Sequence, residues 1–412
     1  MTTTTDIGRH APPAANVSGT SGATTRDPRL DVFRGISMFV ILISHAPGNP
    51  WSNWIWGRFG FSDAAEVFVF CSGMASAVAF GGTFDRAGWT LGTARVAFRV
   101  WQVYWAHIGL FLVIAFAMAA LNAAGFSDKN YIFALNLQRF FEETGPQLLG
   151  LMTLTYVPNF FDILPMYIVL LMMIPLVMAL HRLSPLAALA ALASLWLATQ
   201  LGRDDFAGTM LGDTFGLRGF PAEPWSDRVW FFNPFGWQIV FFTGFALMKG
   251  WIPAPPVTPW LIALASAVVL VSVPIVWWPL RGDYPLLRDI WDAIEPLRPK
   301  TEEGILRYVH LLSLAYLAWA AAGRGGHRLM PHGQSPLDRA RDGTLAIITR
   351  VGQQSLAVFM VSMLGSRLMG VLLDETVPAA LVNILGIATL IATAYTVAWF
   401  KSQPWRVRRS IT

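Results

Sequence analysis

Long apolar segments alternate with polar loops along most of this chain, from about residue 30 to about residue 400. A helix needs roughly 20 mainly apolar residues to cross a bilayer. Ten segments approach or exceed this length, at residues 30–46, 64–82, 98–121, 164–180, 185–201, 229–248, 258–280, 305–322, 345–372 and 378–399. The pattern predicts an all-α, polytopic integral membrane protein with about ten transmembrane helices.

The composition agrees with this class. The chain is 54% hydrophobic and only 13% charged, with a mean hydropathy of +0.49, whereas about a quarter of the residues of soluble domains are charged. The single cysteine, Cys71, excludes an internal disulfide and a cysteine metal cluster. The sequence also lacks a G-x-x-x-x-G-K-[ST] phosphate loop and an H-E-x-x-H motif. We therefore expect no ATP hydrolysis.

Basic residues concentrate in alternate loops, on the side where both ends of a ten-span chain would lie. Lysine and arginine retained near spans mark the cytoplasmic side, so both termini are predicted to be cytoplasmic. This bias accounts for most of the net charge of +5 and fits contact with anionic lipid headgroups. It does not indicate nucleic-acid binding.

Three regions follow from these patterns. Residues 1–25 are rich in Thr, Ala, Ser, Pro and Gly and have few bulky apolar residues, so they are predicted to be a disordered cytoplasmic tail. Residues 26–400 form one transmembrane domain, and residues 401–412 form a basic cytoplasmic tail. No apolar run follows Arg9, which argues against a signal peptide.

The first span contains two ionisable residues, Arg34 and His45, within the run LDVFRGISMFVILISH. Eleven steps of about 100° place both side chains on one helix face, about 16 Å apart along the axis. Ionisable groups inside a membrane are costly unless they are paired or used. We therefore predict that Arg34 and His45 line one internal path.

Tryptophans are frequent in the loops predicted to lie outside, and two interpretations remain open for them. Most could form an interfacial aromatic belt. Alternatively, some could stack against the flat faces of sugars; the candidates are Trp51, Trp54, Trp56, Trp225 and Trp230.

Several stretches of the chain resemble the OpgC family, a branch of the membrane acyltransferase family 3 superfamily. They are RLDVFRG, His45, FGFSDAAEVFVFCSG, ARVAFRVWQVYWAH, DILPMYIVLL, FNPFGWQIVFFTGFAL and VGQQSLAVF. The similarity covers roughly residues 26–400. The R-x10-H element is shared across the superfamily, while S-D-A-A-E-V-F and N-P-F-G-W-Q indicate the OpgC branch.

This resemblance implies an acyltransferase of the bacterial inner membrane. Such an enzyme would transfer a succinyl or similar acyl group from cytoplasmic acyl-CoA to hydroxyls of osmoregulated periplasmic glucans. Acyl-CoA would be the donor substrate on the cytoplasmic side and the glucan the acceptor on the periplasmic side, with the lipid bilayer around the protein. Because the donor nucleotide is then a bound substrate, no metal and no permanently bound cofactor are expected. A glycan or lipid transporter and a non-catalytic scaffold of glucan assembly remain alternatives, and the oligomeric state, including a homo-oligomer, remains open.

His45 is the expected catalytic base. Imidazole has an unperturbed pKa of about 6.5 and suits proton removal from a sugar hydroxyl at neutral pH. His45 lies at the outer end of the first span, just before Pro47. Asp63 and Glu66 begin the second span on the same side, so either carboxylate could orient the imidazole. Equally, His45 could cap its own helix end, and Asp63 and Glu66 could form a capping box.

Arg34, Arg95 and Arg99 are the candidates for binding the phosphates of the donor. Arg95 and Arg99 lie one turn apart at the cytoplasmic start of the third span, although arginines that only set topology would occupy the same positions. His107 lies about two turns deeper, where an ionisable group is a functional candidate by default.

The remaining candidates concern the acyl group and the glucan. Arg367, in the outer half of the ninth span, could bind a carboxylate such as that of a succinyl group, or could reach the interface with its long side chain. Trp51, Asp162 and His310 lie near outer span ends and are candidate substrate contacts. Helix capping by Asp162 and interfacial anchoring by His310 are the alternatives.

Overall fold

The computed structural model describes residues 27–125, 128–331 and 333–405. These stretches contain many helices and no β-strand, apart from one isolated bridge between Pro221 and Val229. The prediction of an all-α protein is therefore confirmed. The predicted tail at 1–25 and most of the basic tail lie outside the described residues.

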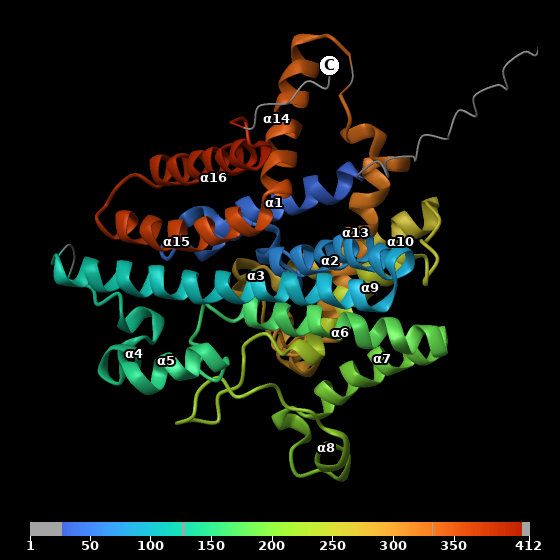
Figure 1. Cartoon of the computed structure of the whole chain (residues 1–412), viewed down its shortest axis with the longest axis horizontal. Helices are drawn as coiled ribbons and strands as arrows, with labels where there is room; N and C mark the ends of the chain where they lie inside the picture. The colour runs from blue at the N-terminus through green and yellow to red at the C-terminus, as the bar shows by residue number, and fades with distance from the viewer. Residues whose placement is uncertain (1–26, 126–127, 332, 406–412) are drawn as a thin grey trace, which may run out of the picture.

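The α-helices are joined by connections that range from single residues to long loops (Figure 1). In chain order they are α1 (Pro28–His45), α2 (Ala64–Ser76), α3 (Gly82–Ala123), α4 (Gln138–Glu142), α5 (Thr144–Thr153), α6 (Ile163–Leu183), α7 (Pro185–Leu201), α8 (Met210–Phe215), α9 (Pro234–Lys249), α10 (Pro259–Val276), α11 (Trp278–Asp283), α12 (Pro285–Ala293), α13 (Ile305–Ala322), α14 (Pro336–Gln353), α15 (Ser355–Asp374) and α16 (Ala379–Ser402). A 3-10 helix, η1 (Pro50–Trp54), follows α1, and a π-helical turn (Ala77–Gly81) joins α2 to α3.

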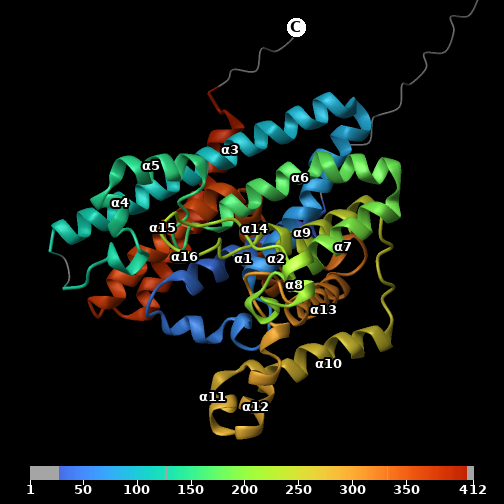
Figure 2. The same ribbon diagram turned by 90° about the horizontal axis from the view of Figure 1, so that it is seen from below.

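Most of the long helices run in roughly the same direction and form one bundle (Figure 1). Helix α2 lies at its centre, packed against α1 and α9, while α15 and α16 cover one side of α1 and α6 packs against α3. Helices α10, α11 and α12 project from the bundle, as the view from below shows (Figure 2). A single large apolar core runs through the bundle, so these helices form one unit.

Among the residues that the structure describes, six helical segments are long and apolar enough to cross a membrane, by length and composition. They are Ala64–Ala123, Ile163–Leu183, Pro259–Val276, Ile305–Ala322, Ser355–Asp374 and Ala379–Ser402. The first has 60 residues and covers two of the predicted spans, with Gly88 at φ +80° interrupting the helix between them. These segments support a polytopic membrane protein.

The predicted span at residues 345–372 is wrong in its first part. Residues as far as Gln353 belong to α14, and the apolar helix begins only at Ser355. Helix α14 is amphipathic and carries charged residues such as Arg339 and Arg341, and it stands steeply to the bundle (Figure 1). The apolar residues of its inner face resemble the start of a span when only their hydropathy is considered.

Helices α2 and α9 approach closely because each has a glycine where they cross. A Cβ atom at Gly73 would lie 1.9 Å from the carbonyl oxygen of Phe241, and one at Gly244 would lie 2.3 Å from that of Phe70. Small residues permit this kind of backbone approach between membrane helices. The crossing holds α2 in the centre of the bundle.

We expect Gly73→Ala to destabilise the protein by about 1–3 kcal/mol, because the added methyl group must push two packed helices apart. Thermal unfolding in detergent measures the effect. Gly109→Ala, in α3, is the matched control, since a Cβ there would have no neighbour within 4 Å. Equal unfolding midpoints for the two variants would contradict the role assigned to this crossing.

Candidate active site

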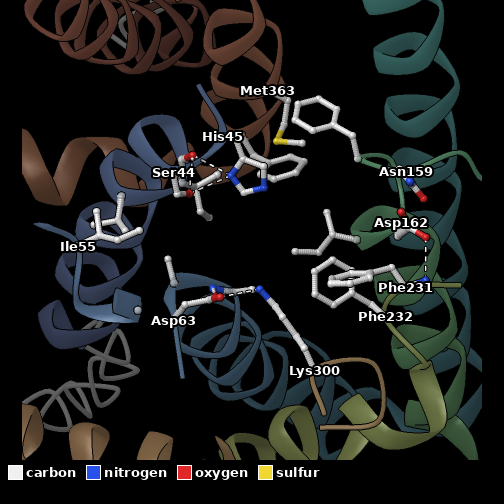
Figure 3. Close-up of a pocket in the computed structure, with 18 of the residues that line it drawn as sticks. Ser44, His45, Ile55, Asp63, Asn159, Asp162, Phe231, Phe232, Lys300 and Met363 are labelled. Carbon is white, nitrogen blue, oxygen red and sulfur yellow. Dashed lines mark hydrogen bonds and ion pairs between the residues drawn. The ribbon is translucent and has the colours of Figure 1, made fainter. Parts of the chain in front are cut away.

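A cavity of about 560 Å³ lies where α1 ends and α2 and α6 begin (Figure 3). The end of α1 forms one wall, and α15 forms another with Phe359, Met363 and Arg367. The cavity is also lined by residues within 55–65 and 159–163, by Ala134 and Leu135, by the aromatic pair Phe231 and Phe232, and by Lys300. Seven segments of the chain therefore meet around one space.

His45 is the last residue of α1, and its imidazole faces this cavity (Figure 3). Its Nδ1 lies 2.9 Å from the carbonyl oxygen of Ile41 and 3.0 Å from Oγ of Ser44. A carbonyl oxygen can only accept, so Nδ1 carries the proton and donates it to Ile41. This leaves the lone pair on Nε2, which has no hydrogen-bond partner among the described residues. The ring is held in the tautomer that a general base needs.

Asp63 and Glu66 form the capping box that begins α2. The backbone N–H of Ala65 donates to Oδ1 of Asp63 at 2.8 Å, and the backbone N–H of Asp63 donates to Oε2 of Glu66 at 2.8 Å. The capping interpretation of these two residues is therefore confirmed. Neither carboxylate is a hydrogen-bond partner of His45, whose Nδ1 is held by a backbone carbonyl instead. Asp63 still lines the cavity, whereas Glu66 is fully buried behind it.

Two cations missed by the sequence analysis pair with these carboxylates. Lys300 lines the cavity, and its Nζ lies 2.5 Å from Oδ2 of Asp63 (Figure 3). Arg307, in the first turn of α13, donates to the buried carboxylate of Glu66 and lies 3.6 Å from Oδ2 of Asp63. Both residues come from a charged loop and helix start that resemble an ordinary solvated surface in the sequence. Their partners lie more than 200 residues earlier, so no local signal identifies the pairs.

A third carboxyl group, that of Glu303, lies beside this network. It is fully buried, and its side-chain oxygens have no hydrogen-bond partner in the described part of the chain. Burial and the neighbouring charge of Glu66 raise the pKa of Glu303 well above its usual range, although Arg307 opposes this. For Asp63, burial alone would raise the pKa, but the charges of Lys300 and Arg307 lower it below its usual range. The network therefore brings three carboxyl groups together with two cations, and its surroundings favour the protonated form of Glu303.

We expect Glu303→Gln to leave the protein as stable as the wild type at pH 7, or more stable. The folded protein retains a proton on Glu303 that the unfolded chain releases above about pH 4.3, so stability falls as pH rises through that range. Glutamine cannot ionise, so the variant does not lose stability as the pH rises. Thermal unfolding at pH 7 and pH 5 measures it, with Glu66→Gln as the control that should destabilise. A large loss of stability in Glu303→Gln would show that the carboxyl is ionised.

Arg367 and Asp162 both line the cavity, as the sequence suggested for substrate contacts. The guanidinium carbon of Arg367 lies 3.8 Å from the centre of the Phe160 ring. Asp162 is buried at the start of α6, and its Oδ1 accepts a hydrogen bond of 2.9 Å from the backbone N–H of Phe231. Burial raises the pKa of Asp162 to about 6, against the effect of this hydrogen bond. Both side chains are therefore within reach of a molecule in the cavity.

Arg34 and Arg99 line a second, narrow crevice next to the cavity. Arg34 donates to Oγ of Ser355, and Arg99 donates to Oε1 of Gln102 at 3.1 Å. Ile163 and Phe359 line both the crevice and the larger cavity, so they form the wall between the two. Arg34 and His45 thus face two adjoining spaces along the inner side of α1.

Besides Glu66, the sequence candidates Arg95, His107, Trp51 and His310 also lie outside both spaces. Arg95 is exposed and donates to Oγ1 of Thr83 at 2.6 Å, and His107 is buried in α3 with both ring nitrogens unpartnered among the described residues. Trp51 is exposed on η1. His310 is buried in α13, where its Nδ1 lies 2.7 Å from Oγ of Ser62.

The cavity can hold an organic substrate between a free imidazole nitrogen, two carboxyl groups and three cations. The family model described as OpgC protein matches residues 26–402, which include every residue of the cavity and the crevice. No curated protein and no solved structure matches the chain. Because the match spans nearly the whole sequence, the chain belongs to the OpgC protein family.

Proposed function

We propose that the protein is an O-acyltransferase that moves a succinyl group from acyl-CoA to a hydroxyl of an osmoregulated periplasmic glucan. Membership of the OpgC family supports a role in succinylation of such glucans. We further propose ten spans, both termini in the cytoplasm and a location in the bacterial inner membrane. In this arrangement the His45 end of α1 faces the periplasm and the Arg34 end faces the cytoplasm.

In the proposed reaction His45 removes the proton from the glucan hydroxyl, and the resulting oxygen attacks the thioester carbonyl. A tetrahedral oxyanion forms and collapses, the carbon–sulfur bond breaks, and the thiolate of coenzyme A takes the proton back from the imidazolium. The products are a glucan ester and coenzyme A. Lys300 is our candidate to stabilise the oxyanion, because its ammonium group lines the same cavity as His45.

Arg34 and Arg99 are proposed to bind phosphates of coenzyme A on the cytoplasmic side. Guanidinium groups suit phosphate because they donate paired hydrogen bonds in a fixed plane. From the crevice between these arginines, the part of acyl-CoA that carries the acyl group would pass between Ile163 and Phe359 to reach the cavity. Since the crevice is narrow, these two side chains must move apart when the donor binds.

The single observation that carries this proposal is the state of His45. A histidine that merely capped its helix would need no cavity, but here Nδ1 is fixed by Ile41 and the other nitrogen faces a space of about 560 Å³. General base catalysis requires an imidazole that is held in one tautomer and whose unprotonated nitrogen is open to the substrate, and His45 meets both conditions.

The direct test supplies purified protein in nanodiscs with radiolabelled succinyl-CoA and a periplasmic glucan. The expected result is label on the glucan, released by mild alkali as succinate because the bond is an ester. A transporter or a scaffold would leave the glucan unlabelled. Mass spectrometry of the product would show about 100 Da added for each succinyl group, which follows from adding succinate and losing water.

A further inference from the structure

Arg367 differs from the other two cations of the cavity, Lys300 and Arg58, each of which has an acceptor for its charge or its hydrogen bonds. Lys300 is paired with Asp63, and Arg58 is exposed and donates to the carbonyl oxygen of Ser52 at 3.2 Å. Arg367 is half-buried in α15, and within the described residues it has neither a carboxylate partner nor a hydrogen-bond acceptor. Its Nε is buried without a partner. Burying a guanidinium group without a partner costs free energy, unless a bound ligand supplies the missing anion or hydrogen-bond acceptor.

The guanidinium group is held flat by an aromatic ring. Its carbon lies 3.8 Å from the centre of Phe160, and the same ring meets the imidazole of His45 edge to face at 5.7 Å. Contact with a ring occupies one face of a guanidinium group and leaves its edges free to donate hydrogen bonds. Phe160 therefore fixes the orientation of Arg367 relative to His45.

Phe160 itself has an unusual backbone. Its φ is +85°, and the N–H of Phe161 donates to the carbonyl oxygen of Pro158, so Phe160 is the third residue of a tight turn. Turns with a positive φ at this position normally have glycine there, because other residues are strained. A large aromatic residue retained at a strained position suggests that the ring is needed beside the cavity.

We propose that Arg367 binds the free carboxylate of a dicarboxylic acyl group and thereby selects it over neutral acyl groups of the same length. This inference rests on the proposed acyltransferase function. It assigns Arg367 and Phe160 to specificity and leaves the proton transfer to His45. Asp63 and Asp162, the two carboxyl groups of the cavity, do not neutralise Arg367 by an ion pair.

The dimensions fit a short diacid. The two ring distances place the guanidinium carbon no more than 9.5 Å from the centre of the imidazole. In a succinyl group, three carbon–carbon bonds of about 1.5 Å carry the far carboxylate roughly 4 Å from the reacting carbonyl. This reach lies within that upper limit, so one succinyl group can lie with its carboxylate toward Arg367 and its thioester carbonyl toward His45.

The test compares succinyl-CoA with butyryl-CoA, which has the same four carbons and a methyl group in place of the carboxylate. In the wild type, transfer of succinyl to glucan should be strongly preferred. In Arg367→Gln, the ratio of succinyl to butyryl transfer should fall by on the order of 100-fold, because the carboxylate loses its charged partner. Arg367→Lys should recover part of the ratio. Arg288→Gln, at an exposed position on α12, should leave it unchanged.

The outcomes separate specificity from structure and from the proposed function. If Arg367→Gln lowers transfer of both donors equally, the arginine only supports the fold and the inference is overturned. If the wild type transfers both donors equally well, no carboxylate site exists and the inference is also overturned. If the wild type transfers neither donor, the acyltransferase proposal itself fails.

Discussion

His45→Gln lowers the rate of acyl transfer by a factor on the order of 10² to 10⁴ while the protein stays folded. The size of this effect is typical for removal of a general base. Glutamine is polar, tolerated in helices and close in length to histidine, so the end of α1 should be preserved. It cannot, however, accept the hydroxyl proton at neutral pH. Single-turnover measurement with labelled succinyl-CoA separates the chemical step from donor binding.

His181→Gln is the matched control for this experiment. His181 lies in the last turn of α6 and stacks on Trp251 at 3.8 Å, and it lines neither the cavity nor the crevice. Its replacement should leave the rate unchanged. Equal rates in His45→Gln and the wild type would exclude His45 as the base and would point to another group in the cavity, such as Asp162.

Arg307→Met destabilises the protein by about 3–5 kcal/mol. This cost is expected when one partner of a buried ion pair is removed and the other charge is left without compensation. Glu66, the partner left behind, is completely buried, and the side chain of Arg307 is only 11% exposed. The start of α2 should loosen, and with it the position of Asp63 and Lys300 in the cavity. Thermal or urea unfolding in detergent measures the loss.

An exposed pair provides the contrast. Arg218 and Asp204 lie 3.6 Å apart with side chains 64% and 98% exposed, so Arg218→Met should cost no more than about 1 kcal/mol. The double variant Arg307→Met with Glu66→Gln should recover part of the lost stability, because the orphaned charge is gone. If Arg307→Met behaves like Arg218→Met, the buried network does not hold α2 in place.

The sequence predicts best those features that depend on local pattern. Apolar runs of the right length predict the helices, and the break at Pro47 predicts where α1 ends, so His45 is correctly placed at a helix terminus. The capping box of Asp63 and Glu66 also follows from a four-residue motif. Helix α14 was mistaken for part of a span because hydropathy alone does not separate an amphipathic helix from the apolar helix that follows it.

The rest of the site depends on contacts between distant segments. Lys300 and Arg307 belong to a loop and helix whose charges resemble a solvated surface until α2 is packed against them. Phe160 is an unremarkable aromatic residue in the sequence, and only its positive φ and its contacts with His45 and Arg367 distinguish it. Such positions require the packed structure, because periodicity and motif spacing carry no information on which helices become neighbours.

The most direct test of the proposed mechanism asks whether acyl transfer crosses the bilayer. Proteoliposomes would hold glucan inside, with labelled succinyl-CoA added only outside. If donor and acceptor meet through the crevice at Arg34 and the cavity at His45, succinyl ester accumulates on the trapped glucan while coenzyme A stays outside. Label on glucan only when both substrates are on the same side of the membrane would contradict a path through the protein.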